Sequence, residues 1–404
     1  MPRLPVALAA SLLMILLSAS ARAQSPSTLP LPDDAQTHYT AAADYSKDHS
    51  GRAVLVQIAG KIVFERYDNG WSAQRFHPLA SGSKSFTGVA AMLAVQDGLL
   101  TLDELACDTL TEWKSDPLKS KITIRHLLTL SSGLDPADEL LGGRGGSRLL
   151  GPGRGTKNEV QARDPKDEPT NLFAEALKVN MTGKPGEQFR YGPSHYYAFG
   201  ELLQRKLAAS TQPQKTVFDY YQVRIFDPLG LRFRVGKDKS GNPKLPGGVI
   251  LTAREWATFG QFILQRGSWP DKEGKPQQLL KPELLELCFK PSKCNPAYGL
   301  TWWLLTDDDT AADAANGAGV LAERVKRRAQ QQVTRAVTGP DGKPLTVHMA
   351  AGKGKQRLFV IPQLNMVVVR FAEDTREGFS FSDQEFLTKL LGGGRTGTSD
   401  DAKK

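Results

Sequence analysis

The sequence predicts a mixed α/β (α+β) fold, in which an antiparallel sheet built from both ends of the chain is flanked by helices. Strand-like runs lie near both ends, at 53–66 and 346–371. Most of the segments between them carry apolar residues at helical spacing, which indicates an inserted all-helical lobe. With 40% hydrophobic residues, the chain can bury the core of one large domain.

The first 23 residues have the features of a secretory signal peptide. Arg3 gives a basic start, an apolar core runs from Leu8 to Leu17, and Ala21-Arg-Ala23 fits a small-residue cleavage site. An uncleaved membrane anchor is the alternative, but the apolar core is shorter than the roughly 20 residues that a spanning helix needs. We therefore expect export, with a secreted or periplasmic protein as the result.

Beyond this leader we expect a single catalytic domain over residues 24–391, with its helical lobe at about 105–245. Residues 24–50 are a polar lead-in. Residues 138–170 are rich in glycine, proline and charge, a composition typical of a long loop. The polar and glycine-rich end of the chain, 392–404, is expected to be a disordered tail.

The elements follow from periodicity and from stop signals. Two strands at 53–59 and 61–66 are joined at Gly60, and a helix from Ser81 stops at Asp97-Gly98. The remaining elements are expected, in chain order, as an extended segment that turns helical at 121–134, helices at 171–179, 196–207, 217–225 and 254–266, strands at 346–351, 357–361 and 366–371, and a closing helix at 383–391.

The chain has one S-x-x-K tetrad, Ser81-Gly-Ser-Lys84. A serine and a lysine three residues apart on one helical turn lie on the same face. The amine can there take the hydroxyl proton and make the serine a nucleophile. Free N–H groups at the start of a helix also favour a developing oxyanion. The alternative is that Ser81 only caps the helix.

The sequence contains no motif of this kind for metal or cofactor binding. The six histidines show no H-E-x-x-H pattern, the three cysteines show no C-x-x-C pattern, and no phosphate-binding glycine motif is present, so we expect no metal and no cofactor. The formal net charge is +9, or +7 without Arg3 and Arg22 of the leader. Contact with an anionic cell-envelope surface suits that charge, whereas nucleic acid does not suit an exported chain without basic-aromatic arrays.

The cysteines leave two readings open. Cys288 and Cys294 are close enough in sequence for a short-loop disulfide in an oxidising compartment, and two separate thiols are the equal alternative. Cys107 is left over and is expected to be a small core residue.

Three of these segments resemble the motifs of the serine β-lactamase and penicillin-binding superfamily. Ser81-Gly-Ser-Lys84 matches its first motif, S-x-x-K. Tyr191-Gly-Pro193 stands at the second, Y-x-N, and Ala350-Ala-Gly352 stands at the third, K-T-G or H-x-G. Tyr298-Gly-Leu-Thr-Trp-Trp303 also resembles the Y-G-L-x-W strand of this superfamily, which implies a strand at 298–303. The resemblance covers about residues 50–390. It is closest to the class C-like branch, with its esterases, D-amino-acid peptidases and 6-aminohexanoate-dimer hydrolase-type amidases, and it implies a β-lactamase/transpeptidase-like fold.

The resemblance also implies roles for individual residues. Ser81 would attack an acyl carbonyl, a neutral Lys84 would receive the serine proton, and Tyr191 would relay it to the leaving group. The N–H groups of Ser81 and Lys353 would form an oxyanion hole, which Gly352 lets the strand approach closely.

His195 was not part of these motifs. It lies at the start of a predicted helix, and we expect it to line the cleft as a substrate-binding residue.

Two departures from the motifs narrow the expected function. Pro193 replaces the asparagine of Y-x-N, and Ala350 replaces the lysine or histidine that binds a substrate carboxylate. The side chain of Lys353 or Lys355 would either supply the missing cation or point to solvent. Both departures argue against β-lactam hydrolysis. We expect an exported serine hydrolase that cleaves a small ester or amide. The alternatives are a catalytically inactive penicillin-binding-like module that recognises cell-envelope material, and a penicillin-binding protein with slow deacylation.

Overall fold

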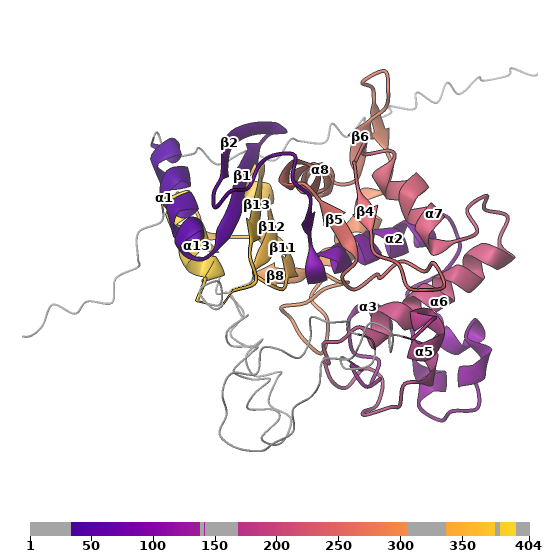
Figure 1. The fold of residues 1–404 in the computed structure, drawn as a ribbon. Helices are drawn as coiled ribbons and strands as arrows, with labels where there is room; N and C mark the ends of the chain where they lie inside the picture. The colour runs from indigo at the N-terminus through magenta and orange to yellow at the C-terminus, as the bar shows by residue number, and fades with distance from the viewer. Residues whose placement is uncertain (1–33, 138–140, 142–168, 306–336, 376–379, 393–404) are drawn as a thin grey trace, which may run out of the picture.

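The computed structural model describes all of the chain except six segments, which are 1–33, 138–140, 142–168, 306–336, 376–379 and 393–404 (Figure 1). The predicted leader, most of the predicted loop at 138–170 and nearly all of the predicted tail lie outside the described residues. None of the helices in the described part of the chain is long and apolar enough to cross a bilayer.

A six-stranded antiparallel sheet forms the centre of the molecule and unites the two ends of the chain (Figure 1). This confirms the predicted sheet, in which a C-terminal strand pairs with the first strand, Val54 opposite Arg370 and Leu55 opposite Val369. In spatial order the strands are β2 (Lys61–Tyr67), β1 (Gly51–Ile58), β13 (Met366–Ala372), β12 (Gln356–Ile361), β11 (Val347–Gly352) and β8 (Trp303–Leu305).

Helices cover both faces of this sheet, because its strands alternate apolar side chains between the two faces. Val54 and Val56 belong to the core beneath α1 (Ala35–Asp48) and α13 (Asp383–Leu391). Leu55, between them, belongs to the other core, which packs against α2 (Lys84–Gln96) and α8 (Ala253–Leu264).

Helix α1 corrects the prediction of a polar lead-in at 24–50. Its exposed face is polar, and its buried residues are mostly small: Tyr39, Ala42, Ala43 and Ser46. They recur at helical spacing, so a helix can bury one narrow stripe without the bulky side chains that usually mark a core helix.

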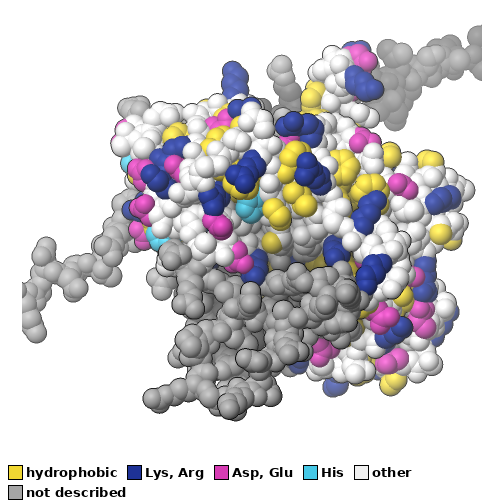
Figure 2. Space-filling model, viewed as in Figure 1, with side chains coloured by type: hydrophobic (Ala, Val, Ile, Leu, Met, Phe, Trp, Pro, Cys, Tyr) yellow, Lys and Arg dark blue, Asp and Glu magenta, His cyan; other side chains and the backbone are white. Residues whose placement is uncertain are grey.

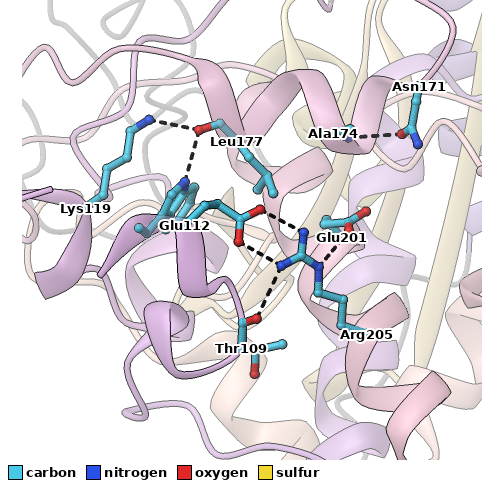
Figure 3. A network of polar contacts seen from close by, with 9 residues as sticks. Thr109, Glu112, Lys119, Asn171, Ala174, Leu177, Glu201 and Arg205 are labelled. Atoms are coloured by element: carbon cyan, nitrogen blue, oxygen red, sulfur yellow. Dashed lines mark hydrogen bonds and ion pairs between the residues drawn. The ribbon is translucent and has the colours of Figure 1, made fainter. Parts of the chain in front are cut away.

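The helical lobe lies beside α2 and is held by polar contacts (Figure 3). Arg205 donates to both carboxylate oxygens of Glu112 at 2.8 Å, and Lys119 donates to the Leu177 carbonyl at 2.9 Å. The helices of the lobe are α3 (Ile124–Leu128), α5 (Leu172–Lys178), α6 (Ser194–Ala209) and α7 (Val217–Tyr221), which continues as a π-helical turn at Gln222–Phe226.

Several short elements were not predicted. A small sheet joins β3 (His77–Pro78), β5 (Val249–Leu251) and β4 (Arg234–Val235). The strand expected at 298–303 begins only at Trp303, because Thr301 adopts a left-handed φ of 70° in the turn before it. The other short elements are β6 (Ser268–Pro270), β7 (Pro276–Gln278), α9 (Pro282–Glu286), β9 (Val337–Thr338) and β10 (Pro344–Leu345).

The cysteines are separate thiols in the structure, which decides between the two readings of Cys288 and Cys294. Burial raises the pKa of the Cys288 thiol far above its usual range. The Cys294 thiol lies 3.0 Å from the Gly186 carbonyl oxygen. Cys107 is buried in the core, where it was expected.

Candidate active site

The turn that carries Ser81 is fixed by the strand beside it. Ser81 lies in a 3-10 turn, Ala80–Ser83, directly before α2, so the helix starts three residues later than predicted. The Leu79 N–H donates to the Val249 carbonyl at 2.9 Å, and the Val249 N–H donates to the Ser83 hydroxyl at 3.0 Å. These two bonds lock the turn to β5 on both sides of Ser81.

Backbone strain stands next to the predicted nucleophile. Ala80 adopts a left-handed φ of 47°, a conformation that is uncommon for a residue with a side chain. Such residues cost on the order of 1–3 kcal/mol and persist only where the surroundings fix them. Here the fixed turn sets the direction in which the backbone enters Ser81.

Ser81 and Lys84 contact one another as the tetrad spacing predicts. The Lys84 Nζ lies 3.0 Å from the Ser81 hydroxyl oxygen and donates to the Pro246 carbonyl at 2.8 Å. The Lys84 side chain is buried, with 5% of its surface exposed. The capping alternative for Ser81 finds no support, since the residue before α2 is Ser83 and its side chain makes no capping bond either.

Tyr191 completes this group. The Lys84 Nζ lies 4.9 Å from the centre of the Tyr191 ring and 5.2 Å from that of Tyr196. Trp303 stacks on Tyr191 with ring centres 6.0 Å apart. The structure therefore brings Ser81, Lys84 and Tyr191 together against an aromatic wall.

The sequence did not single out Tyr196 and Tyr298 as site residues. Their hydroxyl groups lie 2.7 Å apart, and burial raises the pKa of both, so both stay protonated. They lie 102 positions apart in the chain, and no local pattern could have paired them. The neighbouring tryptophans differ in burial: Trp302 is fully buried, and Trp303 is partly exposed.

His195 lies behind this site and does not line it. The side chain is fully buried; its Nε2 donates to the Arg190 carbonyl at 2.8 Å, and its Nδ1 accepts from the Ser132 hydroxyl at 2.9 Å. Burial lowers the pKa of His195 to about 4. A buried ring with both nitrogens engaged has no group left for a substrate, so we now assign His195 to holding the backbone next to Tyr191.

The strand β11 approaches the Ser81 turn closely. A Cβ atom on Gly352 would lie 2.0 Å from the Leu79 carbonyl oxygen, so only glycine fits there. Within the described part of the chain, neither the Ser81 N–H nor the Lys353 N–H donates a hydrogen bond. Buried or half-buried amides are normally paired, and two unpaired donors on either side of a close backbone contact suit an oxyanion.

The two residues that depart from the motifs are apolar and buried. Pro193 stands at the start of α6 and offers no polar side-chain atom. Ala350 is buried in the core that contains α2. The Lys353 Nζ pairs with Asp374 at 2.8 Å. Burial, and to a lesser degree the charges of Arg357 and Arg370, lowers the pKa of Lys355. Neither lysine side chain replaces the missing cation of the third motif.

The surface charge is mixed on the face shown in Figure 2. Lysine and arginine side chains lie among acidic and hydrophobic ones there and form no continuous basic surface. The expected contact with an anionic envelope surface therefore stays a prediction without a defined site. Among the described residues, no group of three or more histidine, cysteine, aspartate or glutamate side chains could hold a metal ion.

The chain is similar to known proteins both in sequence and in fold. A family model described as Beta-lactamase matches residues 37–391. The solved structure of a putative 6-aminohexanoate-dimer hydrolase from Bacillus anthracis superposes with a TM-score of 0.59 at 17% identity, over 86% of this chain and 79% of that one. At this identity the match shows the β-lactamase-like fold alone.

Two curated relatives share more sequence over shorter stretches. An uncharacterized protein of Alkalihalophilus pseudofirmus is 39% identical over 272 residues, 64% of this chain and 71% of that protein. A lovastatin esterase of Penicillium rubens is 32% identical over 173 residues, which are 38% of this chain and 37% of the esterase. The match with the esterase thus spans well under half of either protein.

Proposed function

This chain belongs to the beta-lactamase family, a family of serine hydrolases, and on that premise we propose that it is an exported hydrolase that cleaves an ester or amide through a Ser81 acyl-enzyme. The single observation that carries the proposal is the 3.0 Å contact between the buried Lys84 amine and the Ser81 hydroxyl. A nucleophile and a base within hydrogen-bond reach are the minimum that covalent acyl transfer needs.

Acylation begins at Ser81. Its Oγ forms a bond to the substrate carbonyl carbon while its proton passes to the neutral Lys84 amine. The carbonyl oxygen becomes an oxyanion, which the N–H groups of Ser81 and Lys353 bind. The bond to the leaving group then breaks, and Tyr191 passes a proton from Lys84 to the departing alkoxide or amine.

Deacylation repeats these steps with water. A water molecule attacks the acyl carbonyl as its proton moves to the Tyr191–Lys84 pair, and the bond to Ser81 breaks as Ser81 recovers its proton. The net reaction consumes one water and releases one acid and one alcohol or amine.

The walls of the site favour uncharged substrates, and esters over amides. Pro193 and Ala350 remove the side chains that would bind an amide group and a carboxylate. Tyr191 and Trp303 instead offer stacked rings suited to an apolar acyl or alcohol group. The likeness to an esterase over part of the chain supports the same preference.

The same two departures favour a second candidate, a non-catalytic module that binds envelope material. A binding module has no use for a buried lysine that contacts a serine hydroxyl, so this candidate ranks second. The two candidates differ in whether Ser81 reacts.

Labelling with a fluorophosphonate tests the proposal. We expect one adduct on the mature protein, mapped to Ser81 by peptide mass, and hydrolysis of p-nitrophenyl butyrate that Ser81→Ala abolishes. The unfolding temperature of the variant should change little, since Ser81 makes no capping bond. Folded wild-type protein without an adduct, or with turnover that survives Ser81→Ala, would falsify the assignment. A long-lived penicillin adduct at Ser81 would instead favour the reading of slow deacylation.

A further inference from the structure

A buried cation lies behind the strand that approaches Ser81. Arg357 is the second residue of β12, and only 4% of its surface is exposed. Its Nε and Nη2 donate to the two oxygens of Asp383 at 2.7 and 3.0 Å. Asp383 is the first residue of α13 and is equally buried. This two-pronged pairing fixes the plane of the guanidinium group.

The remaining nitrogen of Arg357 reaches the turn between β11 and β12. Its Nη1 donates to the Gly352 carbonyl at 3.2 Å and to the Gln356 carbonyl at 3.0 Å. Gly352 and Lys353 share one peptide group, so the carbonyl that Arg357 binds and the N–H of Lys353 are its two ends. That N–H is one of the two donors assigned to the oxyanion hole.

We propose that Arg357 is a positioning residue that orients and polarises the oxyanion-binding N–H of Lys353. The inference rests on the proposed function. A planar peptide held at its carbonyl cannot rotate its N–H away from the acyl group. A cation on the carbonyl oxygen also draws electron density from the amide, and linked hydrogen bonds of this kind strengthen one another in a low-dielectric interior.

A second contact restrains the same turn from the other side. The Gln356 amide nitrogen donates to the Lys353 carbonyl at 3.1 Å and to the Ala372 carbonyl at 2.6 Å. The Gln356 oxygen accepts from the Ala372 N–H at 2.9 Å. Gln356 thereby ties the turn to β13, and Arg357 ties it to α13. Both peptide groups next to the Lys353 Cα are held through their carbonyl oxygens.

The competing explanation is that Arg357 only anchors α13 to the sheet. Such a role would affect stability and leave the chemistry of folded molecules unchanged. A positioning role lowers kcat and leaves KM nearly unchanged, because the oxyanion exists only after the substrate has bound. Removing a whole oxyanion donor costs about 100- to 1,000-fold in kcat, so misplacing one should cost less.

The experiment compares Arg357→Lys, Arg357→Met and wild type in p-nitrophenyl butyrate hydrolysis, at a temperature where circular dichroism shows each to be folded. We expect kcat to fall about 10-fold in Arg357→Lys, which keeps the charge but loses the planar guanidinium group, and about 50-fold in Arg357→Met. KM should stay within about twofold in both.

Arg205→Met is the matched control. It removes another arginine that is paired with carboxylates, in the helical lobe (Figure 3). It should lower the unfolding temperature and leave kcat unchanged.

Each outcome separates this inference from the proposed function. If folded Arg357→Lys and Arg357→Met keep wild-type kcat, the positioning role is wrong while the hydrolase stands; if Arg357→Met does not fold, Arg357→Lys decides alone. If the fraction of Ser81 that the fluorophosphonate labels falls by the same factor as kcat, the variants only contain fewer active molecules, and Arg357 is only an anchor. Wild-type protein without label or turnover would defeat the hydrolase itself, before any variant is compared.

Discussion

The two sides of the candidate site differ in what they retain. On the α2 side, Ser81 and Lys84 form the complete pair that covalent chemistry needs. On the opposite side, Pro193 and Ala350 stand where the related motifs carry an amide and a cation. The residues that perform a reaction and those that select its substrate are thus separate sets, and one can change while the other stays.

Removing the base should have the largest effect. Lys84→Met keeps the volume of the side chain but removes the proton acceptor of Ser81, so we expect kcat to fall by about 10³- to 10⁴-fold. Tyr191→Phe should cost about 10²-fold, because it removes only the relay. The rates of p-nitrophenyl butyrate hydrolysis and of Ser81 labelling would measure both.

Tyr220→Phe is the control for these variants. It removes a buried hydroxyl that donates to Asp97 at 2.7 Å, away from the site. It should lower the free energy of unfolding by about 1–3 kcal/mol and leave the rates unchanged. Rapid labelling of Ser81 in Lys84→Met would show that Lys84 is not the base that activates Ser81.

The buried His195 should make the free energy of unfolding depend on pH in the acid range. Its pKa is lowered to about 4 in the folded state from an ordinary value near 6.5, so the unfolded chain binds the extra proton first as the pH falls. Its contribution is complete above about pH 6.5, is lost progressively down to about pH 4, and amounts to roughly 3 kcal/mol. Urea unfolding of His195→Gln should show a correspondingly flatter dependence on pH.

His348 provides the matched comparison for this prediction. Burial also lowers its pKa to about 4, but its ring stacks on Phe289 and makes no contact with Arg190. His348→Gln should flatten the pH dependence in a similar way and leave kcat unchanged. His195→Gln should also reduce kcat about tenfold, because the backbone next to Tyr191 is released. Equal rates in the two variants would refute a positioning role for His195.

The sequence was sufficient where a feature depends on neighbours in the chain. All strands of the main sheet except β8 follow from alternation and turn residues, and the Ser81–Lys84 contact follows from a spacing of three on a helical turn. The end of α2 follows from Gly98, whose left-handed φ of 70° stops the helix.

The features that could not be predicted depend on distant parts of the chain or on orientation. Tyr196 meets Tyr298 only through the packing of the lobe on the sheet. His195 was expected in the cleft, but the face that α6 presents to Ser132 decides its direction. Helix α1 was not predicted because most of its buried residues are alanines and a serine, which carry little hydrophobic signal.

The smallest effect is expected from restoring the asparagine of the second motif at position 193. Pro193→Asn restores the side-chain amide of the second motif at the N-cap of α6, a position that asparagine favours, so the fold should be kept. We expect the ratio of amide to ester hydrolysis, measured on p-nitroanilide and p-nitrophenyl butyrates, to rise about threefold, the share of one hydrogen bond. Pro193→Ala removes the ring without adding the amide, and should leave that ratio at the wild-type value. If both variants shift the ratio equally, the proline ring and not the missing amide shapes this wall, and the difference between the two sides of the site is one of shape rather than of polarity.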